Sequence, residues 1–156
     1  MKRRTPSGDV LTDVILEVFR VNGDLISEGD RIAGAFGQSS ARWQVLGAIA
    51  DDARTVPEIG RAMGLTRQAV QRTADILEGD GLLEYRDNPA HRRSKLVAMT
   101  ARGRRVYDAI TEKQLVWANR LAADMDVGIQ DIRKTVRVLK SLGTALESTI
   151  DANGAR

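Results

Sequence analysis

The sequence contains no cysteine, which excludes a disulfide-stabilised scaffold, a thiolate zinc site and a thiol redox switch. It also lacks a glycine-rich phosphate loop and any paired-carboxylate arrangement. The single histidine, His91, falls in an expected exposed turn, where a solvated imidazole is favoured over a metal ligand or a catalytic base. Catalysis is therefore the least favoured class of function, and we expect no metal site and no cofactor.

Long apolar segments are also missing, since no run approaches the ~20 residues that span a bilayer. The opening "MKRRTPSGD" is basic but leads into no continuous apolar segment, so we expect no signal peptide and a cytoplasmic location. A chain of 156 residues fits one domain or one compact multi-helix unit.

The net charge is only +3, and the positions of the charged residues are more informative than this value. Between Arg86 and Arg105, Asp87 is the sole acid. The basic residues there are Arg86, Arg92, Arg93, Lys95, Arg102, Arg104 and Arg105. Such clustering is typical of a surface that contacts a polyanion, although a solvated positive face is an equally simple interpretation.

Apolar spacing predicts a long helix over 10–35 and a second one capped by Ser39 or Ser40, with Leu46 and Ile49 facing inward. We expect residues 1–8 to form a disordered basic tail and the final "DANGAR" to be disordered as well. Trp43 and Trp117 are both interpreted as core residues.

The segment 55–81 carries two helix starts separated by a turn. "TVPE" is a capping-box pattern in which Thr55 and Glu58 satisfy each other's backbone, and Gly64 suits the left-handed end of that short helix. Thr66 can cap the next helix. The expected buried side of the first helix is Ile59, Ala62 and Met63; that of the second is Val70, Thr73, Ala74 and Leu77. This is a helix-turn-helix plan.

The second of these helices would present long polar side chains on its outer face. Arginine can fork onto guanine and glutamine onto adenine, and a hydroxyl at the helix start suits a phosphate oxygen. The candidate DNA-binding residues here are Thr66, Arg67, Gln68, Gln71 and Arg72. A solvated helix face remains the alternative.

Two strand-like runs, 82–86 and 95–99, follow directly, with Asn88 and Pro89 in the turn between them. A basic hairpin after a helix-turn-helix is a wing, which would reach a neighbouring DNA groove with Arg92, Arg93 and Lys95. Thr100 can cap a further long helix, ending near Met125, and a last helix follows Gly128.

The run "TVPEIGRAMGLTRQAVQRTADILEGDGLLEYRDNPAHRRSKLVAMTARG", together with the preceding "SSARWQVLGAI", resembles the winged helix-turn-helix of the MarR family of bacterial transcription regulators. The most diagnostic piece is "NPAHRRSKLVAMTARG". One position departs from the family pattern: His91 stands where an aspartate usually braces the second arginine, here Arg93. In its absence Asp87 is a candidate substitute.

The resemblance implies a mainly α fold with a small β-hairpin wing: a winged helix-turn-helix lobe over 38–100, flanked by dimerisation helices over 9–37 and 101–156. The apolar residues assigned to the homodimer interface are Val14, Ile132, Val136, Leu139 and Leu146. The same helices could instead wrap their own core. By the same resemblance, a small aromatic or anionic effector would be bound by Phe19, Arg42 and Trp43.

Together these features predict a non-enzymatic homodimer that binds pseudopalindromic double-stranded DNA, a repressor released by that effector. A winged helix used only for protein interaction is the alternative, because the fold serves both purposes. The polar outer helix face and basic wing favour DNA, since protein-docking surfaces more often carry aromatic anchors.

Overall fold

The computed structural model describes residues 4–154, with side-chain burial described through residue 149. The chain forms two compact units, Met1–Val116 and Trp117–Arg156, which meet within one helix. The elements in order are α1 (Pro6–Gly34), α2 (Ser40–Ala48), β1 (Arg54–Thr55), α3 (Val56–Met63), α4 (Arg67–Gly79), β2 (Leu83–Arg86), β3 (Leu96–Met99), α5 (Ala101–Asp124) and α6 (Ile129–Gly154). The mainly helical fold with a hairpin wing is confirmed.

Both ends of the chain are more helical than the sequence suggested. Thr5 caps α1 by accepting a hydrogen bond from the backbone N–H of Gly8 at 3.1 Å. Pro6 is the first residue of the helix, a position whose N–H would have no partner within the helix. Helix α6 continues to Gly154. The expectation of disorder was therefore wrong for 6–8 and 151–154; residues 1–3 and 155–156 lie outside the described part of the chain.

Helices α3 and α4 form the helix-turn-helix. The capping box is confirmed: the backbone N–H of Thr55 donates to Glu58 Oε2 at 2.7 Å, and Glu58 N–H donates to Thr55 Oγ1 at 3.4 Å. Gly64 ends α3 at φ 64, a left-handed conformation that glycine adopts without penalty. Thr66 caps α4 by accepting from Ala69 N–H at 3.1 Å. These local signals fix the turn.

The core of this lobe forms where α2, α3, α4 and the strands meet. Val70, Ala74 and Leu77 are fully buried, as the sequence predicted for the docking face of α4. One prediction for α3 was wrong: Ala62 is exposed, and Gly60 takes its place on the buried side. A Cβ added to Gly60 would lie 2.8 Å from the carbonyl oxygen of Leu65, so α3 and the turn pack closer than any side chain permits.

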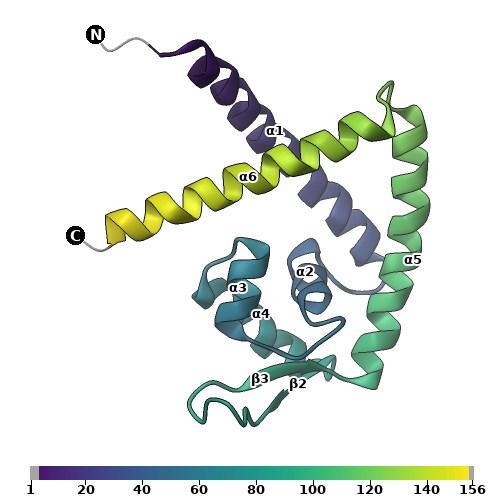
Figure 1. Ribbon diagram of the computed structural model, residues 1–156. Helices are drawn as coiled ribbons and strands as arrows, with labels where there is room; N and C mark the ends of the chain where they lie inside the picture. The colour runs from purple at the N-terminus through teal and green to yellow at the C-terminus, as the bar shows by residue number, and fades with distance from the viewer. Residues whose placement is uncertain (1–3, 155–156) are drawn as a thin grey trace. The chain divides into compact units, whose positions relative to one another are not determined.

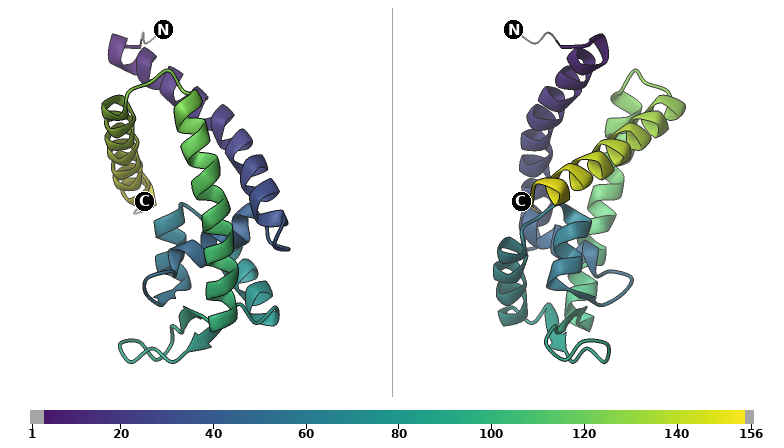
Figure 2. Two further views of the ribbon diagram at one scale, coloured as in Figure 1. Left: turned by 90° about the vertical axis from the view of Figure 1, so that its right-hand side faces the viewer. Right: turned by 60° about the vertical axis from the view of Figure 1, so that its left-hand side comes forward.

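The wing is a three-stranded antiparallel sheet in the order β1-β3-β2. Both predicted strands are present, each starting one residue later than expected. Leu83 pairs with Met99 at the base and Arg86 with Leu96 at the outer end. Strand β1, whose two residues pair with β3, was not predicted from the sequence. The hairpin projects beyond the helices of the lobe (Figures 1 and 2).

The base of the wing is tied to the start of α5. Thr100 N–H donates to Leu82 O at 3.1 Å, and its hydroxyl donates to Gly81 O at 2.8 Å. That hydroxyl also accepts from Gly103 N–H at 3.0 Å, which confirms Thr100 as the cap of α5. An added Cβ on Gly103 would overlap the carbonyl of Leu82, so only glycine fits this junction.

The long terminal helices leave much of their apolar surface exposed. Helix α1 buries only its last turns against α2: Gly29, Ile32 and Ala33. In α6 none of the side chains described, 129–149, is buried. Trp43 and Trp117 are half-buried, so their assignment to the core was wrong for the single chain. Of the helices within residues 4–154, none is long and apolar enough to cross a membrane.

Candidate nucleic-acid interface

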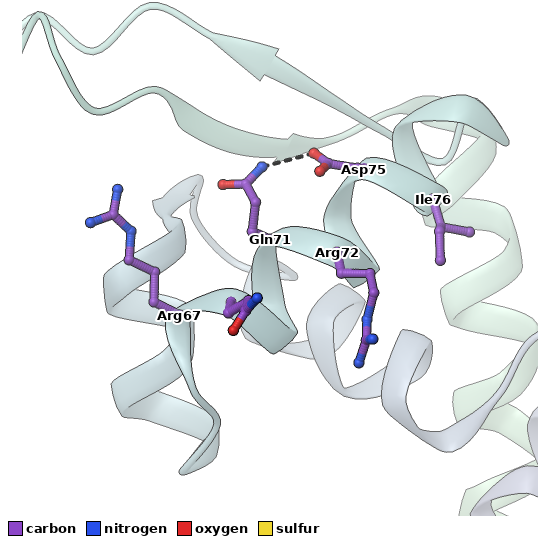
Figure 3. Close-up of a pocket in the computed structure, with 6 residues that line it drawn as sticks. Arg67, Gln71, Arg72, Asp75 and Ile76 are labelled. Atoms are coloured by element: carbon purple, nitrogen blue, oxygen red, sulfur yellow. Dashed lines mark hydrogen bonds between the residues drawn. The ribbon is translucent and has the colours of Figure 1, made fainter.

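The outer face of α4 carries the polar side chains expected of it. Arg67, Gln68, Gln71 and Arg72 are all exposed. They line an open groove of about 730 Å³ along the helix, which Asp75 and Ile76 extend (Figure 3). The groove therefore offers guanidinium and amide groups, one carboxylate and one apolar side chain.

The N-terminus of α4 begins at Arg67, and the backbone N–H groups of a first helical turn have no partners within the helix. Thr66 uses a lone pair of its hydroxyl oxygen to cap Ala69, so the hydroxyl hydrogen is still available as a donor. The first turn contains no acid. Because the helix dipole adds partial positive charge here, this end suits an anionic oxygen.

A second hollow, of about 280 Å³, joins α4 to the wing. Arg67 and Gln71 line it from the helix, and Arg93 and Lys95 from the hairpin. The sequence predicted that the polar face of α4 and the basic wing lie on the same side of the molecule, and residues of both line this hollow. Arg92 lies apart from this hollow, beside a further recess of about 530 Å³ that Asp87 and Lys95 also line.

Fewer of the basic side chains between Arg86 and Arg105 are available to contact DNA than the sequence suggested. Arg86 pairs with Glu84 on the same strand at 2.6 Å. Arg104 donates to the backbone carbonyl of Ala50 and lies over the ring of Tyr107, 5.7 Å from its centre. Both arginines are therefore engaged by groups within the protein.

Arg93, by contrast, has no carboxylate at ion-pair distance within the described part of the chain. The suggestion that Asp87 replaces the usual wing aspartate is therefore wrong. His91 contributes its backbone instead, accepting from Ser94 N–H at 3.0 Å and donating to Asn88 O at 3.2 Å. Hydrogen-bonded backbone turns therefore shape the wing tip.

The side-chain amide of Gln71 is hydrogen-bonded within the protein, whereas the sequence suggested an amide without internal partners. Its Nε2 donates to Asp75 Oδ1 and to the Tyr85 hydroxyl, each at 2.7 Å, and that hydroxyl donates to Asp75 Oδ1 at 2.8 Å. Two effects raise the pKa of Tyr85: burial of the side chain is the larger, and the hydrogen bond to Asp75 is the second. The phenol therefore stays protonated and can donate a hydrogen bond. These three side chains, the Gln71–Asp75–Tyr85 ring, link α4 to β2.

Comparison with known proteins decides what this lobe is. The family model described as the MarR family matches residues 36–94, which contain the helix-turn-helix and most of the wing. The chain belongs to the MarR family. It is thus a winged helix-turn-helix transcription regulator that binds DNA, in a family of regulators and not of enzymes, as the sequence resemblance indicated.

The chain is also similar over most of its length to bacterial proteins. The chain is 43% identical to the uncharacterised protein Rv2011c of Mycobacterium tuberculosis over 83% of this chain and 91% of that protein. It is 27% identical to the transcriptional activatory protein BadR of Rhodopseudomonas palustris, over 71% of this chain and 65% of BadR.

Among solved structures, the MarR regulator AbsC of Streptomyces coelicolor shares the fold with a TM-score of 0.76 at 15% identity, covering 95% of this chain and 99% of AbsC. CouR of Rhodococcus jostii RHA1, bound to p-coumaroyl-CoA, gives a TM-score of 0.75 at 22% identity over 84% of this chain and 92% of CouR.

The residues suggested for an effector are not gathered into one site by the contacts of this MarR chain. Phe19 is 71% exposed and lies ten positions before Gly29, about 15 Å along α1 from the turn that meets Ser40 of α2. Arg42 pairs with Asp80 at 3.2 Å, and Trp43 is half-buried beside it in the chain.

Two residues of this surface, Asp75 in the groove and Tyr85 in the second hollow, were missed by sequence reasoning. Asp75 follows Gln71 by four positions, so the helical period alone places their side chains together. Tyr85 lies two positions after buried Leu83 on β2 and therefore shares its inward face, but only the tertiary fold brings its hydroxyl to Asp75.

Proposed function

We propose that this MarR-family regulator binds a pseudopalindromic operator as a homodimer, with α4 in the major groove and the wing on the adjacent backbone or minor groove. The observation that carries the proposal is the shared hollow lined by Arg67 and Gln71 of α4 and by Arg93 and Lys95 of the wing. A surface to which two elements each contribute long cationic side chains suits two contact points on one duplex.

Different residues would take different roles on the duplex. Arg67, Gln68, Gln71 and Arg72 would face base edges, because the major groove distinguishes all four base pairs. Arg92 and Lys95 would contact phosphates, and Thr66 would add a hydroxyl donor at the helix start. Arg93, which has no carboxylate at ion-pair distance among the described residues, would enter the minor groove, where a narrow A-tract attracts arginine.

The proposed homodimer rests on the terminal helices. Val136, Leu139 and Leu146 of α6 are 46%, 40% and 53% exposed, although they recur at helical spacing. Ile132 and, on α1, Val14 are half-exposed on the same kind of face. Contiguous apolar faces of this kind mark protein interfaces, and a second copy offers a matching apolar face.

We further propose control by a small aromatic or anionic ligand that releases the protein from DNA. Support comes from two proteins of the same fold: CouR, solved with p-coumaroyl-CoA, and a Staphylococcus aureus MarR, solved with salicylate and kanamycin. In this chain Trp43 and Arg42 lie in α2, and Phe19 is exposed on α1. A ligand that contacts Trp43 should quench its fluorescence and lower operator affinity together.

The experiment that tests the core proposal is selection of bound sites from random duplexes, combined with sedimentation of the protein alone. We expect inverted repeats whose half-site centres lie about one turn, ~10 bp, apart, and a mass twice 17.1 kDa. A single asymmetric half-site, or a monomer that binds DNA tightly, would contradict the dimer model.

The direction of regulation needs a separate measurement, because one relative, BadR, is named an activatory protein. A reporter driven by a promoter that contains the selected operator should fall when the regulator is expressed and recover when the ligand is added. Reporter output that rises with the regulator would overturn the repressor proposal and leave operator binding intact.

A further inference from the structure

A carboxylate stands in the groove proposed to meet DNA. Asp75 is exposed on the outer face of α4, and within the described residues no lysine, arginine or histidine lies at ion-pair distance from it. Negative charge on such a surface repels the phosphate backbone and weakens binding to every sequence. The side chain therefore needs a compensating role, and its hydrogen bonds indicate one.

Asp75 Oδ1 accepts two hydrogen bonds, one from Gln71 Nε2 at 2.7 Å and one from the Tyr85 hydroxyl at 2.8 Å. Gln71 Nε2 gives its second hydrogen to the Tyr85 oxygen, also at 2.7 Å. Both hydrogens of the glutamine amide are thereby used inside the protein. An ionised carboxylate can only accept, so the amide nitrogen, and not the oxygen, must face Asp75.

The group left over is the amide oxygen of Gln71. In Figure 3 the Gln71 oxygen lies on the side of the amide away from Asp75, and the dashed hydrogen bond leaves from the nitrogen. A free glutamine reads adenine by donating to N7 and accepting from N6 at the same time. A glutamine whose nitrogen is occupied keeps only the acceptor.

We propose that Asp75 and Tyr85 are positioning residues that turn Gln71 into an acceptor-only reader of the major groove. Such a reader accepts from the amino groups of adenine N6 and cytosine N4 alike, and it rejects guanine and thymine, which offer acceptors there. The operator would then tolerate adenine or cytosine at one position of each half-site. This inference rests on the proposed entry of α4 into the major groove.

Docking on DNA should strengthen the ring. Hydrogen bonds gain strength as water leaves the groove, because the local dielectric falls. Turning the Gln71 nitrogen towards a base would strip Asp75 of a donor in the same dehydrated groove, and a desolvated carboxylate without its partners is costly. The internal bonds therefore compete well against the second bond to adenine.

The test compares selected binding sites for the natural protein, Gln71→Ala, the double variant Asp75→Ala/Tyr85→Phe, and the triple variant that adds Gln71→Ala. In the natural protein we expect adenine and cytosine within about threefold of each other at one symmetric position, each about tenfold above guanine and thymine. The double variant frees the amide, so adenine should rise about tenfold over cytosine. Both variants that lack Gln71 should show no preference there.

Two further variants separate positioning from charge and from folding. Glu78→Ala removes another exposed acid of α4, outside the ring; it should raise affinity for all DNA while leaving the adenine-to-cytosine ratio unchanged. Asp75→Ala alone places a good helix former at an exposed site, so the protein should fold, and the ratio should still shift towards adenine.

The outcomes distinguish failure of the positioning role from failure of the proposed base contact by Gln71. If the natural protein already selects adenine alone, or if the ring variants leave the ratio unchanged while Gln71→Ala abolishes the preference, the ring has no positioning role and the proposed use of α4 survives. If Gln71→Ala alters no position, both the inference and the base-reading role of Gln71 are overturned.

Discussion

Helices α4 and α6 both carry apolar residues at steps of three and four, yet they bury them differently. In α4 the side chains of Val70 and Leu77 are fully buried against the rest of the lobe. In α6 the equivalent seam leaves Leu139 and Leu146 40% and 53% exposed. The periodicity identifies an apolar face in each helix, and only the packing of the chain says whether that face is already covered.

The difference suggests a division of labour. The lobe is stabilised by its own buried core. The terminal helices instead expose apolar surface, which a second molecule could cover. Changes in the first region should then act on folding, and changes in the second on assembly. Substitutions in both regions test that contrast, in order of decreasing effect.

The largest effect should follow from charge in the α6 seam. Leu139→Glu would bury a carboxylate in the proposed dimer interface, so the protein should sediment as a monomer. Operator affinity should then fall about a hundredfold or more, because the two half-sites are no longer engaged together. Ser141→Glu, which adds the same charge on a different face of α6, should change neither mass nor affinity.

A truncation in the lobe core should act on folding instead. Leu77→Ala removes a fully buried side chain, and such cavities cost about 2–5 kcal/mol of unfolding free energy. Denaturant titration monitored by circular dichroism measures the loss. Leu146→Ala, at an exposed seam position, should lose much less when the protein is held at a concentration where it is monomeric; an equal loss would contradict the contrast.

Within the DNA surface, helix and wing should also separate. Arg72→Ala should cost roughly 1–3 kcal/mol on the selected operator and relax one position per half-site. Arg92→Ala should weaken all sequences alike and flatten the slope of log affinity against log salt by about 0.9 for each phosphate that is no longer neutralised, twice in a dimer. Titrations on operator and scrambled duplexes across a salt series distinguish the two. An unchanged slope and affinity for Arg92→Ala would remove the wing from the interface.

The smallest effect concerns the capping box of α3. The backbone and side-chain hydrogen bonds from Thr55 lower the pKa of Glu58, so this stabilisation is complete above the ordinary pKa of a glutamate. It is lost as pH falls through the lowered pKa and Glu58 becomes protonated. Thr55→Ala should therefore cost about 1 kcal/mol at neutral pH, and less in acid.

Thr66→Ala provides the matched control for that pH dependence. Thr66 caps α4 in the same way, but Ala69 stands where the box would need a glutamate. Its loss in unfolding free energy should be similar at neutral pH and should stay constant as the solution is acidified. A deficit that shrinks equally in both variants would detach the effect from Glu58.

The features predicted correctly from the sequence are local ones. A cap involves residues three apart, so Thr55, Thr66 and Thr100 could be assigned from short patterns, as could the left-handed Gly64. The buried face of α4 also followed from spacing. In each case the interacting atoms are brought together by the helix or turn itself.

The misses depend on contacts between distant segments. Strand β1 is two residues long and is defined by its pairing with β3. Gly60 displaces Ala62 from the buried side because α3 approaches the backbone of Leu65. The ring at Gln71 needs Tyr85, which arrives from another element. Periodicity contains none of this information.

The tie at the base of the wing has a consequence for the entropy of binding. Thr100 fastens the end of β3 to the backbone of Gly81 and Leu82, and the strands stay paired as far as Arg86 and Leu96. Ordering a backbone residue costs roughly 1–2 kcal/mol, so a hairpin that had to fold on its target would forfeit much of its contact energy. Here the strands are paired before any duplex arrives, so their ordering takes nothing from the free energy of binding.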